Sequence, residues 1–408
     1  MPEDKKKTKT KYVLQPEVNI GMIGHVDHGK TSLTQALTGK WVDTHSEELK
    51  RGISIRLGYA DAVFYKCAKC KGTEAYGAKE KCQNCGAKAE LLRKVSFVDA
   101  PGHETLMATM LSGAAIMHGA ILVIAANEKC PQPRTEEHLV ALKISGTKNI
   151  VVAQNKVDLV SKEEALLNRK EIEEFLEKYG YKEIPIIPTA ATLGLNIDML
   201  IEAIEKNIPT PKYDKSAKLK MYVARSFDVN RPGANPEELK GGVIGGSIMQ
   251  GEVNLGDEIE ITPGINGKKL ITKVKSIAVS DGEIEKAGPG GLVAISTGLD
   301  PNVTRNDSMR GQVASVPGFM PEPNAKIRME IRALNRLVNK NTSEINVNEV
   351  LMLALGTASI LGNVSRKDAN EIYEIICKNP AIAEKGSKVA ISRKDETGWR
   401  LAAYGVIL

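Results

Sequence analysis

A glycine-rich segment between an apolar run and a helix-prone run constrains this 408-residue chain more than any other feature. Residues 24–31 fit the pattern Gly-x4-Gly-Lys-Ser/Thr, with the strand-like residues 18–23 before them and the helix-prone residues 31–37 after them. A strand that leads into a glycine turn and then a helix directs backbone N–H groups at phosphate oxygens. The pattern predicts a phosphate-binding loop in an α/β domain, and a chance glycine turn is the alternative.

The side chains of this loop suggest chemical roles. Lys30 supplies a positive charge between the outer phosphates of a nucleotide, and the hydroxyl of Thr31 is placed to ligate Mg²⁺, which prefers oxygen ligands. Backbone N–H groups of the turn are expected to hold the phosphates. The predicted nucleotide-binding residues here are Asp27, His28, Gly29, Lys30, Thr31 and Ser32.

A second motif, residues 99–103, follows the apolar residues 95–98. Asp99 closes the predicted strand, where a carboxylate can hold a metal-bound water, although such an Asp taken alone is more often a helix cap or turn residue. Gly102 offers a backbone N–H that can sense a γ-phosphate. His103 stands where a side chain can orient the attacking water, so we predict His103 as the catalytic residue.

A third motif, residues 155–158, follows another buried run. The carboxylate of Asp158 can accept from N1–H and the 2-amino group of guanine, while Asn155 faces the base edge and braces the loop. Adenine offers neither donor, and sites built on such bonds reject analogues that lack them. A lone Asn-Lys-x-Asp, here with Lys156, is a weak signal, but third in an ordered series it predicts GTP and GDP as ligands.

The next predicted strand, residues 184–188, leads into residues 189–192. Guanine-nucleotide domains usually carry Ser-Ala there, and Ala190 stands for the serine. A side-chain hydroxyl is therefore lost while the backbone donors remain. We expect guanine contacts from this loop through the main chain of Ala190, Ala191 and Thr192.

Four of the six cysteines form two Cys-x2-Cys pairs separated by eleven residues, namely Cys67, Cys70, Cys82 and Cys85. Four thiolates suit tetrahedral Zn²⁺ and leave no open coordination position, so a structural zinc ribbon at about residues 65–90 is predicted. Disulfides are the alternative, but nothing marks the chain as secreted. Since the ribbon is inserted between residue 54 and Asp99, we expect it to lie close to the segments that sense the γ-phosphate.

Hydropathy and charge indicate the cellular compartment of the protein and the character of its first residues. The chain lacks an apolar run of transmembrane length, which predicts a cytoplasmic protein with no membrane partner. Residues 1–15 carry five Lys against two acidic residues, a net +3 (5 − 2) that is half of the whole chain's +6. They are expected to form a basic flexible arm, with RNA contact as the alternative.

The pattern of apolar residues changes twice along the chain. Over residues 16–212 strands alternate with helices, which predicts a mostly parallel sheet, and Ser161 with Glu164 predicts a capping box that opens a helix. Glycine turns between short strands predict a β-barrel over residues 213–323. Strict alternation from Lys326 marks a half-buried strand and predicts a third, all-β domain over residues 324–408.

Together these motifs resemble the translational GTPases, and most closely the gamma subunits of archaeal and eukaryotic translation initiation factor two. The lack of a long N-terminal extension favours the archaeal form. The resemblance implies an α/β P-loop GTPase domain with an inserted zinc ribbon, followed by two all-β barrel domains. It rests on residues 24–31, 45–55, the zinc ribbon, residues 154–158, 225–230 and 240–247.

The resemblance implies a GTPase that binds methionylated initiator tRNA, delivers it to the small ribosomal subunit and releases it after GTP hydrolysis. It implies a heterotrimer, with an alpha subunit on the middle barrel and a beta subunit on the nucleotide domain. Another aminoacyl-tRNA carrier, for elongation or for selenocysteine, is one alternative. An RNA-binding scaffold with weak GTPase activity is the other.

The resemblance also implies metal ligands and shows departures. Members of the family can hold a second Mg²⁺, so the predicted Mg²⁺ ligands are Asp27, Thr31, Gly52, Ser54 and, through water, Asp99. Ser54 occupies a switch position usually filled by Thr, and its hydroxyl can still reach the metal. His118 stands where relatives tend to have Asp, and we expect a histidine whose hydrogen bonds are satisfied.

Overall fold

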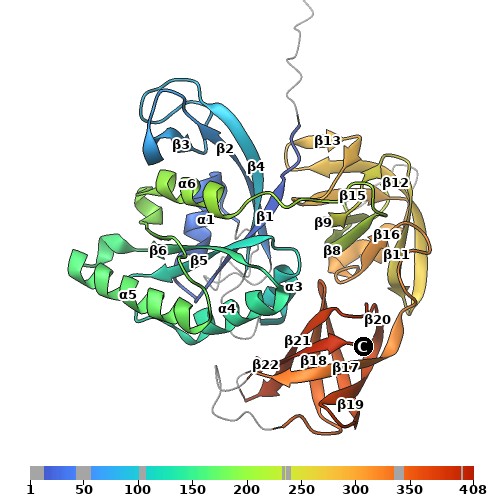
Figure 1. Ribbon diagram of the computed structural model, residues 1–408. Coiled ribbons are helices and arrows are strands. Elements are labelled where there is room, and N and C mark those ends of the chain that lie inside the picture. Colours follow the sequence, from blue (N-terminus) through green and yellow to red (C-terminus); the bar gives the residue numbers. More distant parts are fainter. Residues whose placement is uncertain are drawn as a thin grey trace, which may run out of the picture.

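The computed structural model describes residues 13–42, 57–100, 107–231, 235, 240–334, 344–396 and 398–408. Within these residues an α/β part is followed by two closed β-barrels (Figure 1). The fold class predicted from the sequence is confirmed. No helix among the described residues is both long and apolar enough to cross a membrane.

The α/β part is built on a seven-stranded sheet with the order β3-β2-β4-β1-β5-β6-β7. Strand β2 runs antiparallel to β4, while β4, β1, β5, β6 and β7 pair in parallel, so their carboxyl ends share one edge. The strands are β1 Val18–Gly24, β2 Gly58–Lys66, β3 Tyr76–Gly77, β4 Glu90–Asp99, β5 Gly119–Ala125, β6 Asn149–Asn155 and β7 Ile186–Pro188. The helices are α1 Lys30–Thr38, α3 Met107–Ala114, α4 Pro133–Ser145, α5 Lys162–Lys178 and α6 Ile197–Asn207, with 3₁₀ turns at Gly72–Ala75, Val157–Leu159 and Ala191–Leu193.

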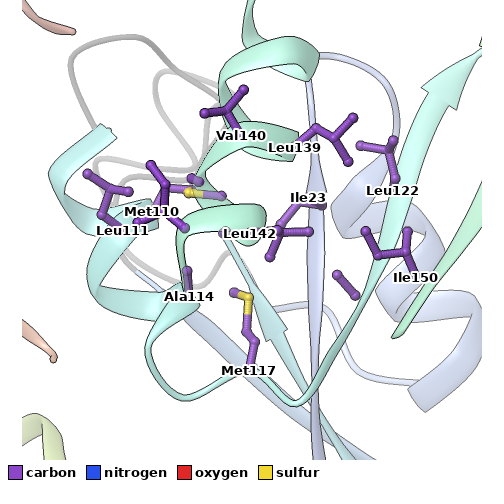
Figure 2. Packing of buried hydrophobic residues seen from close by; sticks show 14 of the residues in the cluster. Ile23, Met110, Leu111, Ala114, Met117, Leu122, Leu139, Val140, Leu142 and Ile150 are labelled. Atoms are coloured by element: carbon purple, nitrogen blue, oxygen red, sulfur yellow. The ribbon is translucent and has the colours of Figure 1, made fainter. Parts of the chain in front are cut away.

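Two hydrophobic cores lie on the two faces of this sheet. Helices α1 and α6 cover one face, and α3, α4 and α5 cover the other. The alternation of side chains along a strand explains how one strand serves both cores, because Met22 packs on the first face and Ile23 on the second. Figure 2 shows Leu139 and Leu142 of α4 beside Ile23.

Replacing Leu142 by Ala should destabilise the α/β part by about 2–5 kcal/mol, because the side chain is fully buried and its removal leaves a cavity. Leu166→Ala on α5 is the matched control, since Leu166 is 57% exposed and should change stability by less than about 0.5 kcal/mol. Urea denaturation of both variants checks this prediction, and equal midpoints would contradict the packing described.

The first barrel closes because β11 pairs with both β16 and β12. Its ring consists of β8 Lys220–Phe227, β9 Val243–Gln250, β11 Glu258–Ile265, β12 Lys268–Val279, β15 Val293–Thr297 and β16 Val313–Ser315. Strand β13 Gly282–Ile284 pairs antiparallel with β12, and β10 Val253–Asn254 pairs with β14 Lys286–Ala287. Helix α7 Pro301–Thr304 precedes a 3₁₀ turn at Arg305–Asp307.

The second barrel closes in the order β17-β20-β19-β18-β21-β22. Its strands are β17 Asn324–Ala333, β18 Val350–Leu355, β19 Ala358–Lys367, β20 Ile372–Ala381, β21 Lys388–Asp395 and β22 Gly398–Ile407. The alternation that predicted its first strand is confirmed, because Ile327, Met329 and Ile331 are all buried in the barrel core.

Both barrels pack against the α/β part (Figure 1). The first barrel reaches β4, where the buried Lys94 Nζ lies 2.7 Å from Asp281 Oδ2. The second barrel packs against α3 and α4, where Arg400 Nη1 lies 3.3 Å from Glu137 Oε1. Polar contacts therefore fix the α/β part to each barrel.

His118 belongs to the junction with the first barrel. Its Nδ1 accepts from the backbone N–H of Asn19 at 3.1 Å, and its Nε2 lies 3.2 Å from the hydroxyl of Tyr213. The side chain of Asn19 in turn donates to Ser247 Oγ of the first barrel at 2.8 Å. The expectation of a histidine with satisfied hydrogen bonds is confirmed.

Candidate functional site: a nucleotide cradle and a thiolate cluster

The glycine-rich loop connects the end of β1 to the start of α1 at the edge where the parallel strands end. Asp27 and Gly29 adopt left-handed conformations, with φ of 61° and 88°. A Cβ atom at Gly29 would lie 2.4 Å from Asn155 Nδ2, so this position has no room for a side chain. The N-cap of α1 is Gly29, which makes no side-chain cap, and the positive end of the helix dipole faces the loop. The loop is therefore shaped to receive an anion.

Two predicted Mg²⁺ ligands meet beside this loop. Thr31 Oγ1 donates to Asp99 Oδ2 at 2.9 Å, which joins the start of α1 to the end of β4. A hydroxyl and a carboxylate at this distance are the hard oxygen donors that Mg²⁺ prefers. Lys30 Nζ crosses the loop and donates to the carbonyl oxygen of His25 at 2.6 Å. Asp27 is exposed on the same loop.

Four of the predicted site residues lie outside the described residues. They are Gly52, Ser54, Gly102 and His103.

Asn155 ties three loops together at the end of β6. Its Nδ2 donates to the carbonyl oxygen of His28 at 2.9 Å. Its Oδ1 accepts from the backbone N–H of Ala191 at 3.1 Å and lies 3.3 Å from Thr189 Oγ1. The phosphate-binding loop is thus fixed relative to both segments expected to recognise the base.

The side chain of Asp158 is exposed beside Asn155. Lys156 has a left-handed φ of 61°, after which the 3₁₀ turn Val157–Leu159 carries Asp158 away from the sheet. Ala190 is buried and Thr192 is exposed in the neighbouring loop after β7. The backbone N–H of Val157 donates to the carbonyl oxygen of Thr189 at 3.2 Å, which joins the turn that carries Asp158 to the start of that loop.

Two histidines near the phosphate-binding loop, His28 and His138, make buried contacts that the motifs do not reveal. The ring of His28 is fully buried, with Nδ1 3.0 Å from the carbonyl oxygen of Val123 and Nε2 3.3 Å from Glu128 Oε2. Burial lowers the pKa of His28, and the carboxylate of Glu128 opposes this shift. Since the ring faces the sheet, a nucleotide can meet only the backbone of His28. The second residue, His138 on α4, contacts Gly24 and lies outside every motif.

The four paired cysteines converge on one point. Their sulfur atoms lie within 4.8 Å of one another, and the Cys67–Cys85 and Cys70–Cys82 sulfur pairs are 3.5 and 3.7 Å apart. A tetrahedral zinc with Zn–S bonds of about 2.3 Å needs sulfurs about 3.8 Å apart. None of the four forms a disulfide. Backbone N–H groups of Cys85 and Asn84 lower the pKa of Cys82 to about 7, which favours the thiolate. The cluster therefore fits a structural zinc ion.

The ribbon lies at the end of β4 that is far from Asp99, while the segments around Ser54 and Gly102, near which we expected it, lie outside the described residues. Strand β4 is ten residues long, and its Glu90 end pairs with Lys66 at the ribbon while its other end is Asp99. At about 3.3 Å per residue the two ends are about 30 Å apart. The ribbon packs against α6, because Tyr76 of β3 contacts the core that α6 covers. Insertion between two motifs places the ribbon near them in sequence, and the long pairing of β2 with β4 separates its cysteines from Asp99.

Elemental analysis should find about one zinc per chain, and Cys82→Ser should abolish it, since three thiolates hold zinc far more weakly than four. Cys377→Ala is the matched control, because this buried cysteine lies in the second barrel, outside the cluster. Full zinc retention by Cys82→Ser would show that the ligand set is wrong.

Comparison with known proteins decides the family. Residues 15–210 match the elongation factor Tu GTP binding domain, residues 241–315 match elongation factor Tu domain 2, and residues 325–407 match the C-terminal domain of initiation factor eIF2 gamma. Translation initiation factor 2 subunit gamma of Methanothermobacter thermautotrophicus is 53% identical over 405 residues, which cover 96% of this chain and 99% of that protein. The protein of the same name from Archaeoglobus fulgidus is 54% identical over 401 residues, covering 96% of this chain and 94% of that protein.

The chain belongs to the gamma-subunit family of translation initiation factor 2. As a member of this family with the matching GTP-binding domain, it is a translational GTPase. A bacterial selenocysteine-specific elongation factor, EF-Sec, superposes with a TM-score of 0.73 at 26% identity, covering 97% of this chain and 58% of that one. Elongation factor SelB from Methanococcus maripaludis, in complex with the GTP analogue GPPNHP, superposes with a TM-score of 0.72 at 22% identity, covering 97% and 80% of the two chains. The latter shows the shared three-part fold.

Proposed function

We propose that this gamma subunit binds methionylated initiator tRNA in its GTP-bound state, delivers it to the small ribosomal subunit and releases it after GTP hydrolysis. The observation that carries the proposal is the match of more than 50% identity over nearly the whole chain to translation initiation factor 2 subunits gamma. The clustering of the nucleotide motifs at one sheet edge supports it. Nothing in the described residues conflicts with an active GTPase site.

Each residue of the nucleotide site has a proposed role. Backbone N–H groups from Asp27 to Ser32 bind the phosphates, and Lys30 leaves His25 to neutralise the outer phosphates. Thr31 and Asp99 hold Mg²⁺, directly and through water, and the bound ion neutralises charge that develops on the phosphates. Asp27, Gly52 and Ser54 complete the proposed metal ligands. Asp158 selects guanine.

We assign GTP hydrolysis, and the conformational change that follows it, to segments that lie outside the described residues. His103 orients the attacking water, and the backbone of Gly102 senses the γ-phosphate. With GTP bound, the γ-phosphate holds the segments around Ser54 and Gly102, and hydrolysis releases both. The two barrels are fixed to the α/β part by polar contacts, so a change in these segments can alter the tRNA-binding surface across the domains.

Partners and domain limits complete the proposal. The chain works in the cytoplasm as the core of a heterotrimer, with an alpha subunit on the first barrel and a beta subunit on the α/β part. Its proposed units are the basic arm 1–15, the GTP-binding domain 16–212 with the zinc ribbon at about 65–90, and the barrels 213–323 and 324–408.

Selectivity among charged tRNAs tests this function against the elongation and selenocysteine alternatives. The chain, with its partner subunits and GPPNHP, should protect methionylated initiator tRNA from deacylation far better than methionylated elongator tRNA or selenocysteinyl-tRNA. Equal protection of the elongator tRNA would favour a general carrier. Failure to protect any charged tRNA, together with only weak GTP hydrolysis, would favour the scaffold alternative.

A further inference from the structure

A buried histidine outside the nucleotide motifs contacts the phosphate-binding loop. His138 lies on α4, is 2% exposed, and accepts a hydrogen bond at Nδ1 from the backbone N–H of Gly24 at 3.1 Å. Gly24 is the last residue of β1 and the first glycine of the Gly-x4-Gly-Lys-Thr loop. The two residues are 114 positions apart. The contact therefore depends on the assembled fold.

The imidazole of His138 is held in the form that can accept this bond. Burial lowers the pKa of His138 to about 3, and the charges of Lys30 and Arg134 act in the same direction. The ring is therefore neutral at physiological pH. Because Nδ1 accepts from Gly24, the single ring proton resides on Nε2.

Gly24 has little freedom to move away from this contact. Its φ is 145°, and a Cβ atom there would lie 2.2 Å from the carbonyl oxygen of Val123. The same carbonyl lies 3.0 Å from Nδ1 of His28, which is part of the loop. The backbone at the start of the loop is thus held between Val123 on one side and His138 on the other.

The packing of helix α4 fixes the position of the acceptor atom, Nδ1 of His138. Leu139, Leu142 and most other residues of α4 are buried, and Figure 2 shows both leucines in the core. The helix contacts β1 and β5 of the central sheet and β21 and β22 of the second barrel (Figure 1). Glu137, next to His138, is fully buried, forms an ion pair with Arg134, and lies 3.3 Å from Arg400 of β22. A helix anchored on two sides holds Nδ1 of His138 in position before any ligand arrives.

We propose that His138 is a positioning residue for guanine-nucleotide binding, holding the first glycine of the loop so that the following N–H groups face the phosphates. It acts through Gly24 and does not touch the nucleotide. Without the acceptor, the buried N–H of Gly24 must turn toward another partner, because an unsatisfied buried donor is costly. That shift lengthens the bonds from the loop to the phosphates, and such bonds weaken steeply with distance and angle.

Three substitutions at one position separate the acceptor from the volume of the side chain. In His138→Asn the side-chain oxygen falls near the place of Nδ1, so the acceptor is kept. In His138→Gln the oxygen falls near the place of Nε2, and in His138→Leu no acceptor is left. Thr135→Val is the control on the same helix, because Thr135 is fully buried and its hydroxyl has no partner within the part of the chain that the structure describes.

The experiment measures the GDP dissociation constant by fluorescence titration, and the melting temperature without nucleotide, for the full chain. We expect His138→Leu and His138→Gln to weaken GDP binding about 10- to 100-fold, the range for a buried donor left without its partner. His138→Asn should regain most of the affinity, and Thr135→Val should bind as the parent chain does. The differences should exceed any change in melting temperature.

Parent-like GDP affinity in His138→Gln would overturn the inference, as would equal losses in the Asn and Gln variants. The Asn and Gln variants decide the matter even if His138→Leu does not fold, since both are polar and differ in where the acceptor stands. The inference rests on the proposed nucleotide site. GDP binding by the parent chain distinguishes failure of that proposed site from failure of the role of His138. If the parent chain does not bind GDP, the proposed function fails; if it binds and the variants do not differ, only the role of His138 fails.

Discussion

Asp158→Asn should weaken GTP and GDP binding about 10²- to 10⁴-fold, because two hydrogen bonds from guanine to a charged acceptor are lost. The same variant should gain affinity for xanthine nucleotides. Xanthine keeps N1–H but carries an oxygen in place of the 2-amino group, so an amide can accept from one and donate to the other. Competition titrations with GDP and xanthosine diphosphate (XDP) measure how far the preference moves from guanine to xanthine nucleotides.

Glu163→Gln is the matched control for this change of charge. Glu163 is exposed in the first turn of α5, five residues beyond Asp158, and its loss should leave both affinities unchanged. Unchanged GTP affinity in Asp158→Asn would remove this residue from base recognition. Loss of both guanine and xanthine binding would instead indicate that Asp158 supports the fold of the loop.

His103→Ala should bind GTP almost normally and lose about 10²- to 10⁴-fold in stimulated hydrolysis, the usual range for a positioned proton-transfer group. Initiator tRNA should then load but leave slowly. Partner components must be present, because such domains hydrolyse GTP slowly alone. Single-turnover hydrolysis and tRNA retention in a reconstituted initiation complex measure both effects.

Two outcomes would contradict this role of His103. Hydrolysis at the parent rate would show that another group orients the water. Loss of GTP binding would give His103 a structural task instead. Lys30→Met provides the comparison for the second case, since removal of the charge between the phosphates should abolish binding itself.

Local patterns in the sequence predict much of this fold. Ser161 and Glu164 form the predicted capping box, with the backbone N–H of Glu164 donating to Ser161 Oγ at 3.2 Å and the backbone N–H of Ser161 donating to Glu164 Oε2 at 2.8 Å. The alternation from Ile327 to Ile331 predicts a strand because the period of two is visible in the residues themselves. The strands that end at the nucleotide motifs are predictable from a different local signal, a nearly continuous apolar run, because these parallel strands are buried on both faces.

Contacts between distant segments could not be predicted from these patterns. Spacing gives no sign that Lys94 lies 2.7 Å from Asp281 in the first barrel, or that His138 supports Gly24. Both depend on how whole elements pack. The ribbon shows the same limit, since the length of the β2–β4 pairing, from Gly58 with Asp99 to Lys66 with Glu90, decides how far its cysteines lie from Asp99. The sequence predicts the thiolate cluster but not its distance from Asp99.

Whether the bound nucleotide controls tRNA binding is decided by the affinity of the assembled factor for methionylated initiator tRNA, compared between the two nucleotide states. With the parent chain, GPPNHP should support much tighter binding than GDP, and xanthine nucleotides should have no effect. With Asp158→Asn, the triphosphate analogue of xanthine should take over this role from GPPNHP. Such an exchange would show that the nucleotide in this site controls tRNA binding. Equal tRNA affinity in both nucleotide states, with the nucleotide sites occupied, would show that the nucleotide does not control tRNA binding by this chain.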